Sequence, residues 1–489
     1  MRDQRFQSTS AHHFFSKKWK YGALSALALI IILAGIFFAI PRIYADQSSQ
    51  RAAKAASAGD WPTYMYNAGR SGYNQAETII NQSSAPKLKL HWSIQSGGKI
   101  FSQPVVANSM VYWGSFDGFE HGANLSGHQV WQQNLGAATT CVTYNPLGVV
   151  SSAAVATVPI NGTPTSVVFV GGGDDHLYAL NAATGAVIWH TAIGNSSINT
   201  FIWDSPLVLG NNVYIGSATT GEGNGCKLIA GQFFELNAST GGIVNTFNSV
   251  PAGCVGGGIW SSPTYDASDG SIYFTAGTQG GCTSDHISIG IVKLRASDLT
   301  YLDSWQIPLN QRLTSDADFA GTPMLFTATI HGTLQKMVGA ADKNGIFYAF
   351  NRASLNSGPV WSSVIAIPGA CPQCGKGSIS SAVWDGSSIY VAGGNTTIKG
   401  QTCGGSVQLL DPATGNFLWQ TCLPQTVLGA LTEVPGVIAL VYGASLTLIN
   451  STTGTQLFNR NGAYYGSPSI SNGVLYAGST VGKIFALGI

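Results

Sequence analysis

The chain has 489 residues, of which 61 are glycine, and only 9% of its residues are charged, against about 25% in typical soluble domains. This composition favours many tight turns and argues against a disordered or largely helical chain. The formal net charge of +1 provides no strongly basic face, which argues against nucleic acid as a partner.

The N-terminal segment predicts a membrane anchor. A polar tail carries Lys17, Lys18 and Lys20, and Gly22–Ile40 contains no charged residue. This run approaches the roughly 20 residues that cross a bilayer and exceeds a secretory core of about 7–15. Because the basic side stays inside, we expect a cytoplasmic tail over 1–20, a span over 21–41, a linker over 42–59 and a domain outside the cytoplasm over 60–489. The alternative, a signal cleaved after Ala45, gives a secreted domain.

From Asp60 onward the chain repeats one pattern of short strands and turns. In Val167–Trp189, apolar strands are separated by Gly/Asp/Asn turns, and the last strand ends on tryptophan. A Ser/Gly-x-Pro start, a Val/Ile-Tyr strand and a Thr-Gly turn before an aromatic residue recur along the chain. They define eight units: Ser102–Trp131, Ser151–Trp189, Asp204–Phe247, Ser261–Trp305, Gly321–Trp361, Ser380–Trp419, Gly429–Phe458 and Gly466–Leu487.

The eighth unit lacks its last strand, and Lys87–Ile94 has the alternation and the tryptophan that would supply it. An N-terminal strand that completes the last unit closes a ring and removes exposed sheet edges. We therefore predict an all-β, eight-bladed β-propeller with four-stranded antiparallel blades. A seven-bladed ring is the structural alternative. The tryptophans that end the units are expected to pack between blades: Trp131, Trp189, Trp305, Trp361 and Trp419.

Eight cysteines predict disulfides in a domain outside the cytoplasm. They are Cys141, Cys226, Cys254, Cys282, Cys371, Cys374, Cys403 and Cys422. Cys403 and Cys422 are placed to link strands of one blade, and Cys371 and Cys374 to close a loop. No histidine follows Cys374, so this Cys-x-x-Cys is not a c-type haem motif and no haem is expected.

The repeat, with its Ala-x-Thr-Gly-x-x-x-Trp ending at Ala182–Trp189, resembles the pyrroloquinoline quinone (PQQ) repeat. Asp60–Tyr64 and Arg70–Asn74 resemble the opening of quinoprotein alcohol dehydrogenases. The resemblance covers nearly all of residues 60–489 and implies the quinoprotein alcohol dehydrogenase-like superfamily. Non-catalytic scaffold propellers carry the same repeat, so the repeat alone does not establish chemistry.

Three segments resemble the family's active-site motifs, closest to the polyvinyl alcohol dehydrogenase branch. In Gly256–Asp266, Trp260 takes the place of the tryptophan on which the quinone lies. In Asp316–Phe326, Asp318 takes the place of the catalytic aspartate. In Ala340–Phe350, Lys343 takes the place of the residue that contacts the reactive carbonyl. Each position also has a structural interpretation: a blade-core tryptophan, a hydrogen bond at a strand start and a β-turn.

The resemblance also implies a calcium site, because oxygen ligands suit Ca²⁺. Glu222, in Ser217–Gly225, takes the place of a calcium-binding glutamate, and Asp318 is a second expected metal ligand. The family's asparagine corresponds to Thr278, expected near the cofactor, or to Gln279.

Other family positions differ in this chain. Cys141 is followed by Val142 rather than by a second cysteine, Leu147 stands where an arginine is expected, and Phe101 stands where an acid is expected. These changes remove a positive partner of the cofactor's carboxylates.

Two functions remain open. The first is a membrane-anchored, PQQ- and calcium-dependent dehydrogenase of a small alcohol, a polyol or a polymer. Asp318 is its general base and Lys343 its carbonyl partner, and electrons pass to a separate acceptor because no haem motif is present. The second is a non-catalytic scaffold that binds envelope or surface proteins or glycans.

Overall fold

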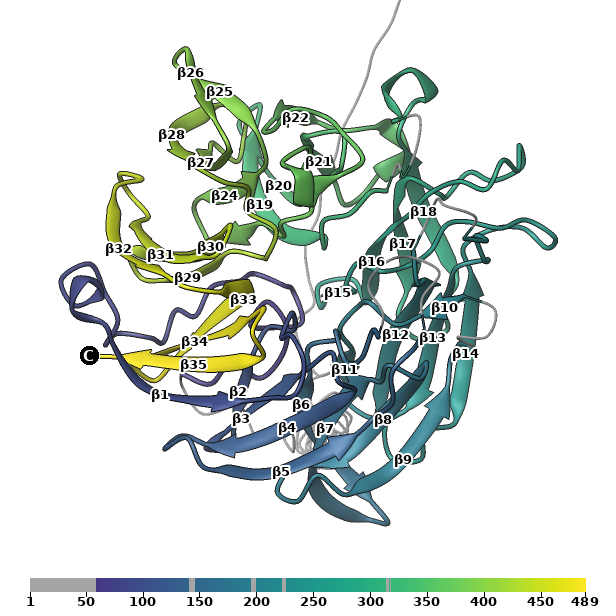
Figure 1. Cartoon of the computed structure of the whole chain (residues 1–489). Coiled ribbons are helices and arrows are strands. Elements are labelled where there is room, and N and C mark those ends of the chain that lie inside the picture. The colour runs from purple at the N-terminus through teal and green to yellow at the C-terminus, as the bar shows by residue number, and fades with distance from the viewer. Residues whose placement is uncertain (1–58, 140–145, 195–198, 222–225, 314–315, 317) are drawn as a thin grey trace, which may run out of the picture. The chain divides into compact units, whose positions relative to one another are not determined.

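The computed structural model describes residues 59–139, 146–194, 199–221, 226–313, 316 and 318–489. Ala55–Ile489 forms one compact unit. Within the described residues, the strands build eight antiparallel blades around a ring, seven of four strands and one, the third, with a fifth short strand (Figure 1). The eight-bladed prediction is therefore confirmed. No helix in these ranges is long and apolar enough to cross a membrane, and the expected span over 21–41 lies outside them.

The first four sheets, blades 1–4, follow the chain in order. They are built from β2 (Val105–Ala107), β3 (Met110–Gly114), β4 (Phe119–Asn124) and β5 (Gln129–Asn134); β6 (Ala154–Ile160), β7 (Thr163–Gly171), β8 (His176–Asn181) and β9 (Val187–Ala192); β11 (Leu207–Leu209), β12 (Asn212–Thr219), β13 (Gln232–Asn237) and β14 (Ile243–Asn248); and β15 (Thr264–Asp266), β16 (Ser271–Ala276), β17 (Gly290–Arg295) and β18 (Tyr301–Gln306). A short strand, β10 (Thr200–Phe201), also pairs with β12.

Blades 5–7 repeat the same meander. They are built from β19 (Met324–Ile330), β20 (Thr333–Ala341), β21 (Ile346–Asn351) and β22 (Trp361–Val364); β23 (Val383–Trp384), β24 (Ile389–Gly393), β27 (Gly405–Leu410) and β28 (Phe417–Leu423); and β29 (Thr432–Val434), β30 (Val437–Tyr442), β31 (Ser445–Asn450) and β32 (Gln456–Asn461). A hairpin of β25 (Thr396–Ile398) and β26 (Gln401–Cys403) extends from blade 6. Short 3₁₀ turns occur at Ala85–Lys87, Leu309–Gln311, Leu355–Ser357 and Pro372–Cys374.

Blade 8 joins the two ends of the ring. It contains β33 (Tyr464–Ser471), β34 (Val474–Ser479) and β35 (Lys483–Gly488), and β1 (Lys89–Gln95) pairs antiparallel with β35 as its outer strand. The predicted closure by an N-terminal strand is thus confirmed.

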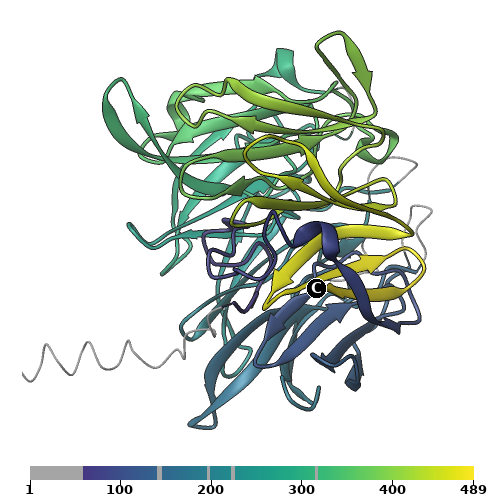
Figure 2. The same ribbon diagram turned by 90° about the vertical axis from the view of Figure 1, so that its left-hand side faces the viewer.

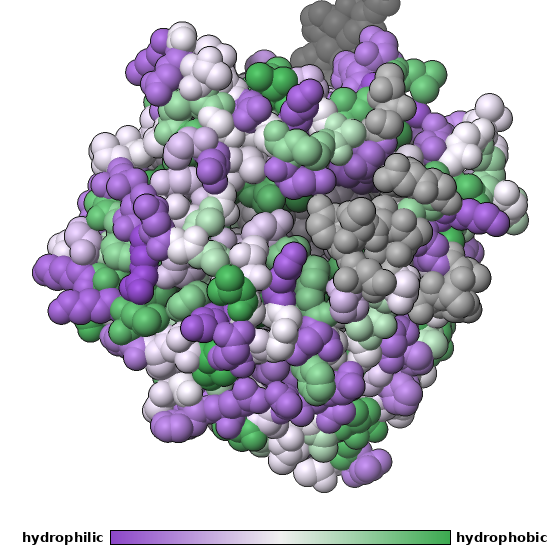
Figure 3. Space-filling view, in the orientation of Figure 1, coloured by the Kyte–Doolittle hydropathy of each residue, from purple (hydrophilic) through white to green (hydrophobic). Residues whose placement is uncertain are grey.

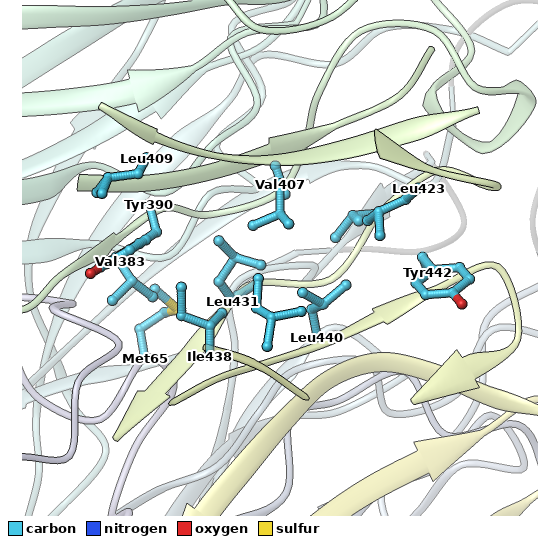
Figure 4. Packing of buried hydrophobic residues seen from close by; sticks show 14 residues of the cluster. Met65, Val383, Tyr390, Val407, Leu409, Leu423, Leu431, Ile438, Leu440 and Tyr442 are labelled. Carbon is cyan, nitrogen blue, oxygen red and sulfur yellow. The ribbon is translucent and has the colours of Figure 1, made fainter. Parts of the chain in front are cut away.

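The hydrophobic core consists of clusters between neighbouring blades. Figure 4 shows one cluster between blades 6 and 7, to which Met65 of the N-terminal segment also contributes. The tryptophans that end the units take part in this packing. Trp189 is 9% exposed and donates its indole N–H to the Ala238 carbonyl of the next blade at 2.9 Å. On the face seen in Figure 3, the described hydrophilic and hydrophobic residues are intermixed around the ring.

The segment over residues 60–74 crosses one face of the ring and connects blades that are distant in sequence (Figure 2). Its backbone exchanges hydrogen bonds with the first strands of blades 1 and 7, and accepts others from blades 2, 4 and 6. Arg70 is fully buried and donates to the carbonyls of Pro206 and Pro263 at 3.1 and 2.9 Å. This segment therefore ties the starts of the blades together across the axis.

Three disulfides are resolved among the described residues. They join Cys254 to Cys282, Cys371 to Cys374, and Cys403 to Cys422, and Cys226 is also disulfide-bonded. The Cys371–Cys374 and Cys403–Cys422 pairs confirm the expected loop and blade links. Cys141 lies outside the described residues.

Candidate functional site

A cavity of about 360 Å³, here called the central cavity, lies among the starts of the blades. This volume is within the range of about 300–1,000 Å³ that is usual for small-molecule sites. Its lining comes from the loops before the innermost strands and from Tyr64 of the N-terminal segment, whose hydroxyl lies 3.1 Å from the Ser381 hydroxyl. The ring therefore builds one site from many blades.

Equivalent residues of neighbouring blades are linked around this cavity by hydroxyl groups. At each link, the backbone N–H of one blade donates to the side-chain hydroxyl of the next. The acceptors are Ser152, Ser205, Ser262, Thr322 and Ser381, at 2.7, 3.0, 3.0, 3.2 and 3.3 Å. Three of these acceptors, Ser205, Ser262 and Thr322, belong to the Ser-Pro and Thr-Pro starts of the repeat, which are thus structural.

Trp260 lines the central cavity at the end of the Gly-Gly-Gly-Ile-Trp turn. Gly256 has φ +102°, a left-handed conformation, and a side chain there would meet the Thr278 carbonyl at 2.5 Å. The Trp260 indole N–H is buried and has no hydrogen-bond partner among the described residues. An unpaired buried donor on the wall of a cavity is available to a ligand.

Lys343 reaches the same site from the turn between β20 and β21. The turn is closed by the Asp342 N–H, which donates to the Ile346 carbonyl at 3.0 Å. The Lys343 ammonium lies 5.4 Å from the centre of the Trp260 ring and donates to Asp316 at 2.6 Å and to Asp318. The segment is therefore a β-turn, and its functional interpretation stays a prediction.

Asp318 is 5% exposed and is held from two sides. One carboxylate oxygen pairs with Lys343, and the other accepts the Thr278 N–H at 2.8 Å and the Thr278 hydroxyl at 3.2 Å. Thr278, expected near the cofactor, thus orients the expected base. Gln279, the alternative, accepts a hydrogen bond from Arg312 at 2.7 Å.

The two carboxylates beside Lys343 differ in acidity. Burial alone would raise the pKa of Asp318, but the Lys343 charge and its hydrogen bond hold that pKa below the usual value. Burial and the nearby Asp318 charge raise the pKa of Asp316 to about 6, despite its own contact with Lys343. The carboxylates in turn raise the pKa of Lys343 against the effect of burial. At neutral pH the cluster of Asp316, Asp318 and Lys343 has one excess negative charge.

This excess charge suits a cation. Within the ranges that the structure describes, no group of three or more His, Cys, Asp or Glu residues is arranged to hold a metal ion. Glu222, the expected second ligand, lies outside those ranges. Asp318 is therefore the expected metal ligand that the structure places at the site.

The opposite wall of the central cavity is aromatic and uncharged. Phe101 stacks on Tyr465 with ring centroids 4.0 Å apart and lies 4.3 Å from Phe116. Leu147 is also on the lining. Two of the positions at which the sequence departs from the family pattern, Phe101 and Leu147, thus line the cavity as apolar groups.

Asp316 was not among the predicted site residues. The sequence feature that could have indicated Asp316 is its position two residues before Asp318. Spacing alone does not show that both side chains contact Lys343. Trp260, Thr278, Asp318 and Lys343 are brought together as expected.

Comparison with known proteins places this geometry in a family. The family model described as "Outer membrane protein assembly factor BamB" (PQQ_2) matches residues 122–252 and 343–489, more than half of the chain. The chain is 25% identical over 350 residues to the quinohemoprotein alcohol dehydrogenase of Comamonas testosteroni. This alignment covers 62% of this chain and 46% of that protein. It is 25% identical over 219 residues to a polyvinylalcohol dehydrogenase of a Pseudomonas species. That alignment covers 40% of this chain and 32% of that protein.

The chain therefore spans less than half the length of these curated relatives. The crystal structure of the Comamonas testosteroni enzyme superposes with a TM-score of 0.70 at 18% identity, covering 90% of this chain and 81% of that one. This similarity concerns the fold. Together with the family match over more than half of the sequence, it shows that the chain belongs to the PQQ-repeat β-propellers of the quinoprotein alcohol dehydrogenase superfamily.

Proposed function

We propose that the chain is a PQQ-dependent dehydrogenase that oxidises an alcohol or polyol with the help of a bound Ca²⁺ ion. The observation that carries the proposal is the contact of Trp260, which lines the central cavity, with Lys343, whose ammonium lies 5.4 Å from the indole ring centre and pairs with Asp318. The proteins named above as alcohol dehydrogenases support it.

The residues present fit a planar, hydrogen-bonding quinone. Trp260 offers an aromatic face and an unpaired indole N–H. The described lining contains no lysine or arginine, so Lys343, at its margin, and a divalent cation at Asp318 would supply the positive charge that the anionic cofactor needs. Trp260 and Lys343 would hold the quinone, and Asp318 with Glu222 would hold Ca²⁺.

When bound, PQQ would supply the acceptor for a hydride, and Ca²⁺ would supply a Lewis acid. The chain's own residues supply the proton chemistry. Asp318 is ionised at neutral pH because its pKa is lowered, so its carboxylate accepts the proton of the substrate hydroxyl. Thr278 fixes the orientation of that carboxylate, and the Lys343 ammonium donates a hydrogen bond to an oxygen that gains charge.

The test is alcohol-dependent dye reduction by the full chain supplied with PQQ and Ca²⁺. Asp318→Asn should lower the rate by roughly 100-fold or more, since a general base contributes about that much. The control is Asp298→Asn, which removes an exposed carboxylate paired with Arg295 and should leave the rate unchanged. A folded Asp318→Asn variant with the wild-type rate would refute this assignment.

A second function, a non-catalytic scaffold for envelope or surface proteins or glycans, is supported by the description of the matching family as an assembly factor. A scaffold would not bind PQQ. We also propose that the domain works outside the cytoplasm behind a single N-terminal membrane span, and the three resolved disulfides support an oxidising compartment. Protease digestion of intact cells tests this location.

A further inference from the structure

The hydroxyl groups that link neighbouring blades have hydrogens that the links do not use. Each oxygen accepts a backbone N–H from the previous blade, and a further link of this kind joins the Ala430 N–H to the Ser467 hydroxyl at 2.7 Å. A hydroxyl group has one hydrogen to donate in addition to its lone pairs. The acceptor residues all line the central cavity, are 3–6% exposed and are here called the hydroxyl cluster: Ser152, Ser205, Ser262, Thr322, Ser381 and Ser467.

Most of these hydrogens have no acceptor in the protein. Four members of the cluster donate to no protein atom among the described residues: Ser152, Ser205, Ser262 and Ser467. Another buried serine behaves differently, because the Ser378 hydroxyl donates to the Ala392 carbonyl at 2.7 Å. A buried donor without an acceptor is costly to maintain. The hydrogens of the cluster are therefore available to an acceptor inside the cavity.

Tyr64 adds a phenol hydroxyl to the same surface. Its oxygen lies 3.1 Å from the Ser381 hydroxyl, and Thr322 is a second partner of this group. Burial raises the pKa of Tyr64, so the phenol keeps its hydrogen at neutral pH. The floor of the central cavity thus presents hydroxyl groups from blades 2–6 and 8 and from the N-terminal segment.

A buried positive charge lies directly behind this floor. Arg70 is fully buried, and it donates to the Pro206 and Pro263 carbonyls. These prolines directly follow Ser205 and Ser262, two members of the hydroxyl cluster. The charge of Arg70 therefore lies next to the backbone that carries the hydroxyl groups.

Arg70 has no carboxylate partner in the part of the chain that the structure describes. Its other hydrogen bonds go to neutral oxygens, among them the Tyr64 carbonyl at 2.6 Å and the Thr63 hydroxyl at 3.0 Å. Burial lowers the pKa of Arg70 to about 10, so the guanidinium stays charged at neutral pH. Asp204 lies within electrostatic range, but burial raises its pKa well above the usual value and weakens it as a counter-ion. A buried cation of this kind is stabilised by an anion nearby.

The cavity itself suits one small negative charge. Its described lining contains no charged side chain, and Asp316 and Asp318 are not part of that lining. No second cation is present there to balance a dianion such as sulfate or phosphate, which would remain buried with excess charge. The donors of the floor and the single charge of Arg70 match a monovalent ion.

We infer that the floor of the central cavity, formed by the hydroxyl cluster and Tyr64, binds a small monovalent anion such as chloride. The hydroxyl groups donate their hydrogens to the ion, and Arg70 provides the opposite charge from behind the floor. This site goes beyond the proposed dehydrogenase function and does not depend on it.

The inference is tested by ³⁵Cl NMR of the full chain in sodium chloride, without PQQ or alcohol. Exchange with a protein site broadens the chloride signal, and added bromide should reverse the broadening by competition. Tyr64→Phe keeps the ring but removes one donor, which should weaken chloride binding by roughly tenfold. The matched control is Tyr301→Phe, which removes an exposed hydroxyl that lies 2.9 Å from the Ser304 hydroxyl and should leave binding unchanged. Equal broadening by the wild type and Tyr64→Phe would overturn the inference.

Two substitutions of Arg70 test the role of its charge. Arg70→Met should abolish the broadening that bromide reverses, whereas Arg70→Lys keeps the charge and should retain it. Chloride broadening by Arg70→Met equal to that of Arg70→Lys would contradict the contribution of this charge.

Thermal unfolding provides a measurement that does not require Arg70→Met to fold. An ion that binds only the folded state raises the Tm. The wild type should unfold roughly 1–3 °C higher in sodium chloride than in sodium methanesulfonate of the same ionic strength, and Tyr64→Phe should show no such difference. A wild-type Tm that is the same in both salts would mean that water alone occupies the floor, and would overturn the inference.

Discussion

Blades 2 and 5 contain the same turn with different side chains. In blade 5 the Asp342 N–H donates to the Ile346 carbonyl at 3.0 Å, and in blade 2 the Gly172 N–H donates to the His176 carbonyl at 2.8 Å. In each turn the third side chain bonds to a tyrosine hydroxyl at 2.8 Å: Asn344 to Tyr348 in blade 5 and Asp174 to Tyr178 in blade 2. The backbone scaffold is therefore shared.

The difference lies at the second position of the turn. Blade 5 has Lys343, which pairs with Asp318, whereas blade 2 has Gly173. The blade 2 residue that corresponds to Asp318 is Gly148, and a side chain at Gly173 would meet its Cα at 2.9 Å. One blade thus places an ion pair where its counterpart packs glycine against glycine. Blade 5 therefore carries an ion pair that blade 2 lacks, although the turn has the same backbone hydrogen bond in both blades.

The largest expected effect comes from removing the cation of blade 5. Lys343→Met leaves Asp318 buried without its counter-ion, which should lower the free energy of unfolding by about 3–5 kcal/mol. Denaturant unfolding measures this, and Lys343→Met/Asp318→Asn should recover part of the loss. Arg295→Met, which breaks an exposed pair, should cost no more than about 1 kcal/mol. Equal losses for the two single variants would contradict a buried pair.

The pH dependence of stability should have opposite signs in the two blades. Burial raises the pKa of Asp175, in the blade 2 turn, to about 7, so the folded state keeps a proton that the unfolded state releases near pH 4. Stability should fall by on the order of 4 kcal/mol as the pH rises through this window. Asp175→Asn should remove that fall.

Asp318 provides the contrast in the same titration. Its pKa is lowered, so its contribution is present above the unfolded pKa of about 4 and is lost as the pH falls. Thermal unfolding at several pH values checks both signs. A wild-type profile that Asp175→Asn leaves unchanged would mean that this carboxyl group is not buried.

The glycine contact of blade 2 should not tolerate a side chain. Gly173→Ala would place a methyl group 2.4 Å from the Gly136 carbonyl oxygen and should cost about 1–3 kcal/mol. Gly242→Ala is the control, because a methyl group there would lie 3.6 Å from the Thr240 hydroxyl, an ordinary contact distance. Similar stabilities of the two variants would contradict the close packing of Gly148 and Gly173.

The smallest expected losses of stability come from the tyrosines that bond to the two turns, Tyr348 in blade 5 and Tyr178 in blade 2. Tyr348→Phe leaves the Asn344 amide buried without its partner and should cost about 1–3 kcal/mol. Tyr178→Phe releases an Asp174 carboxylate that is 35% exposed and that water can solvate, so it should cost less than about 1 kcal/mol. Denaturant unfolding of both variants tests the order, and a reversed order would contradict the burial assigned to Asn344.

Sequence reasoning predicted the ring because its signals are local and repeated. Strand alternation, Thr-Gly turns and closing tryptophans recur in each unit, and Lys87–Ile94 supplied the missing strand. Trp260, Asp318 and Lys343 were located by their family motifs. Their association with Asp316 was not predicted, because it depends on how loops of blades 4 and 5 fold toward each other.

The chain of hydroxyl links could also not be predicted from the sequence. Ser205 and Ser262 are ordinary strand-start residues in their own blades, and they become partners only when the blades are set side by side. Such sites belong to the ring and not to any single repeat.

The most direct measurement is a calorimetric titration of the full chain with PQQ in the presence of Ca²⁺. The account predicts one PQQ bound per chain, loss of binding in Trp260→Ala, and unchanged binding in Trp92→Ala, whose indole lies on β1 and donates to the Leu125 carbonyl away from the central cavity. Absence of binding to the wild type, or equal binding by the two variants, would contradict the proposed dehydrogenase and leave the scaffold as the function of this propeller.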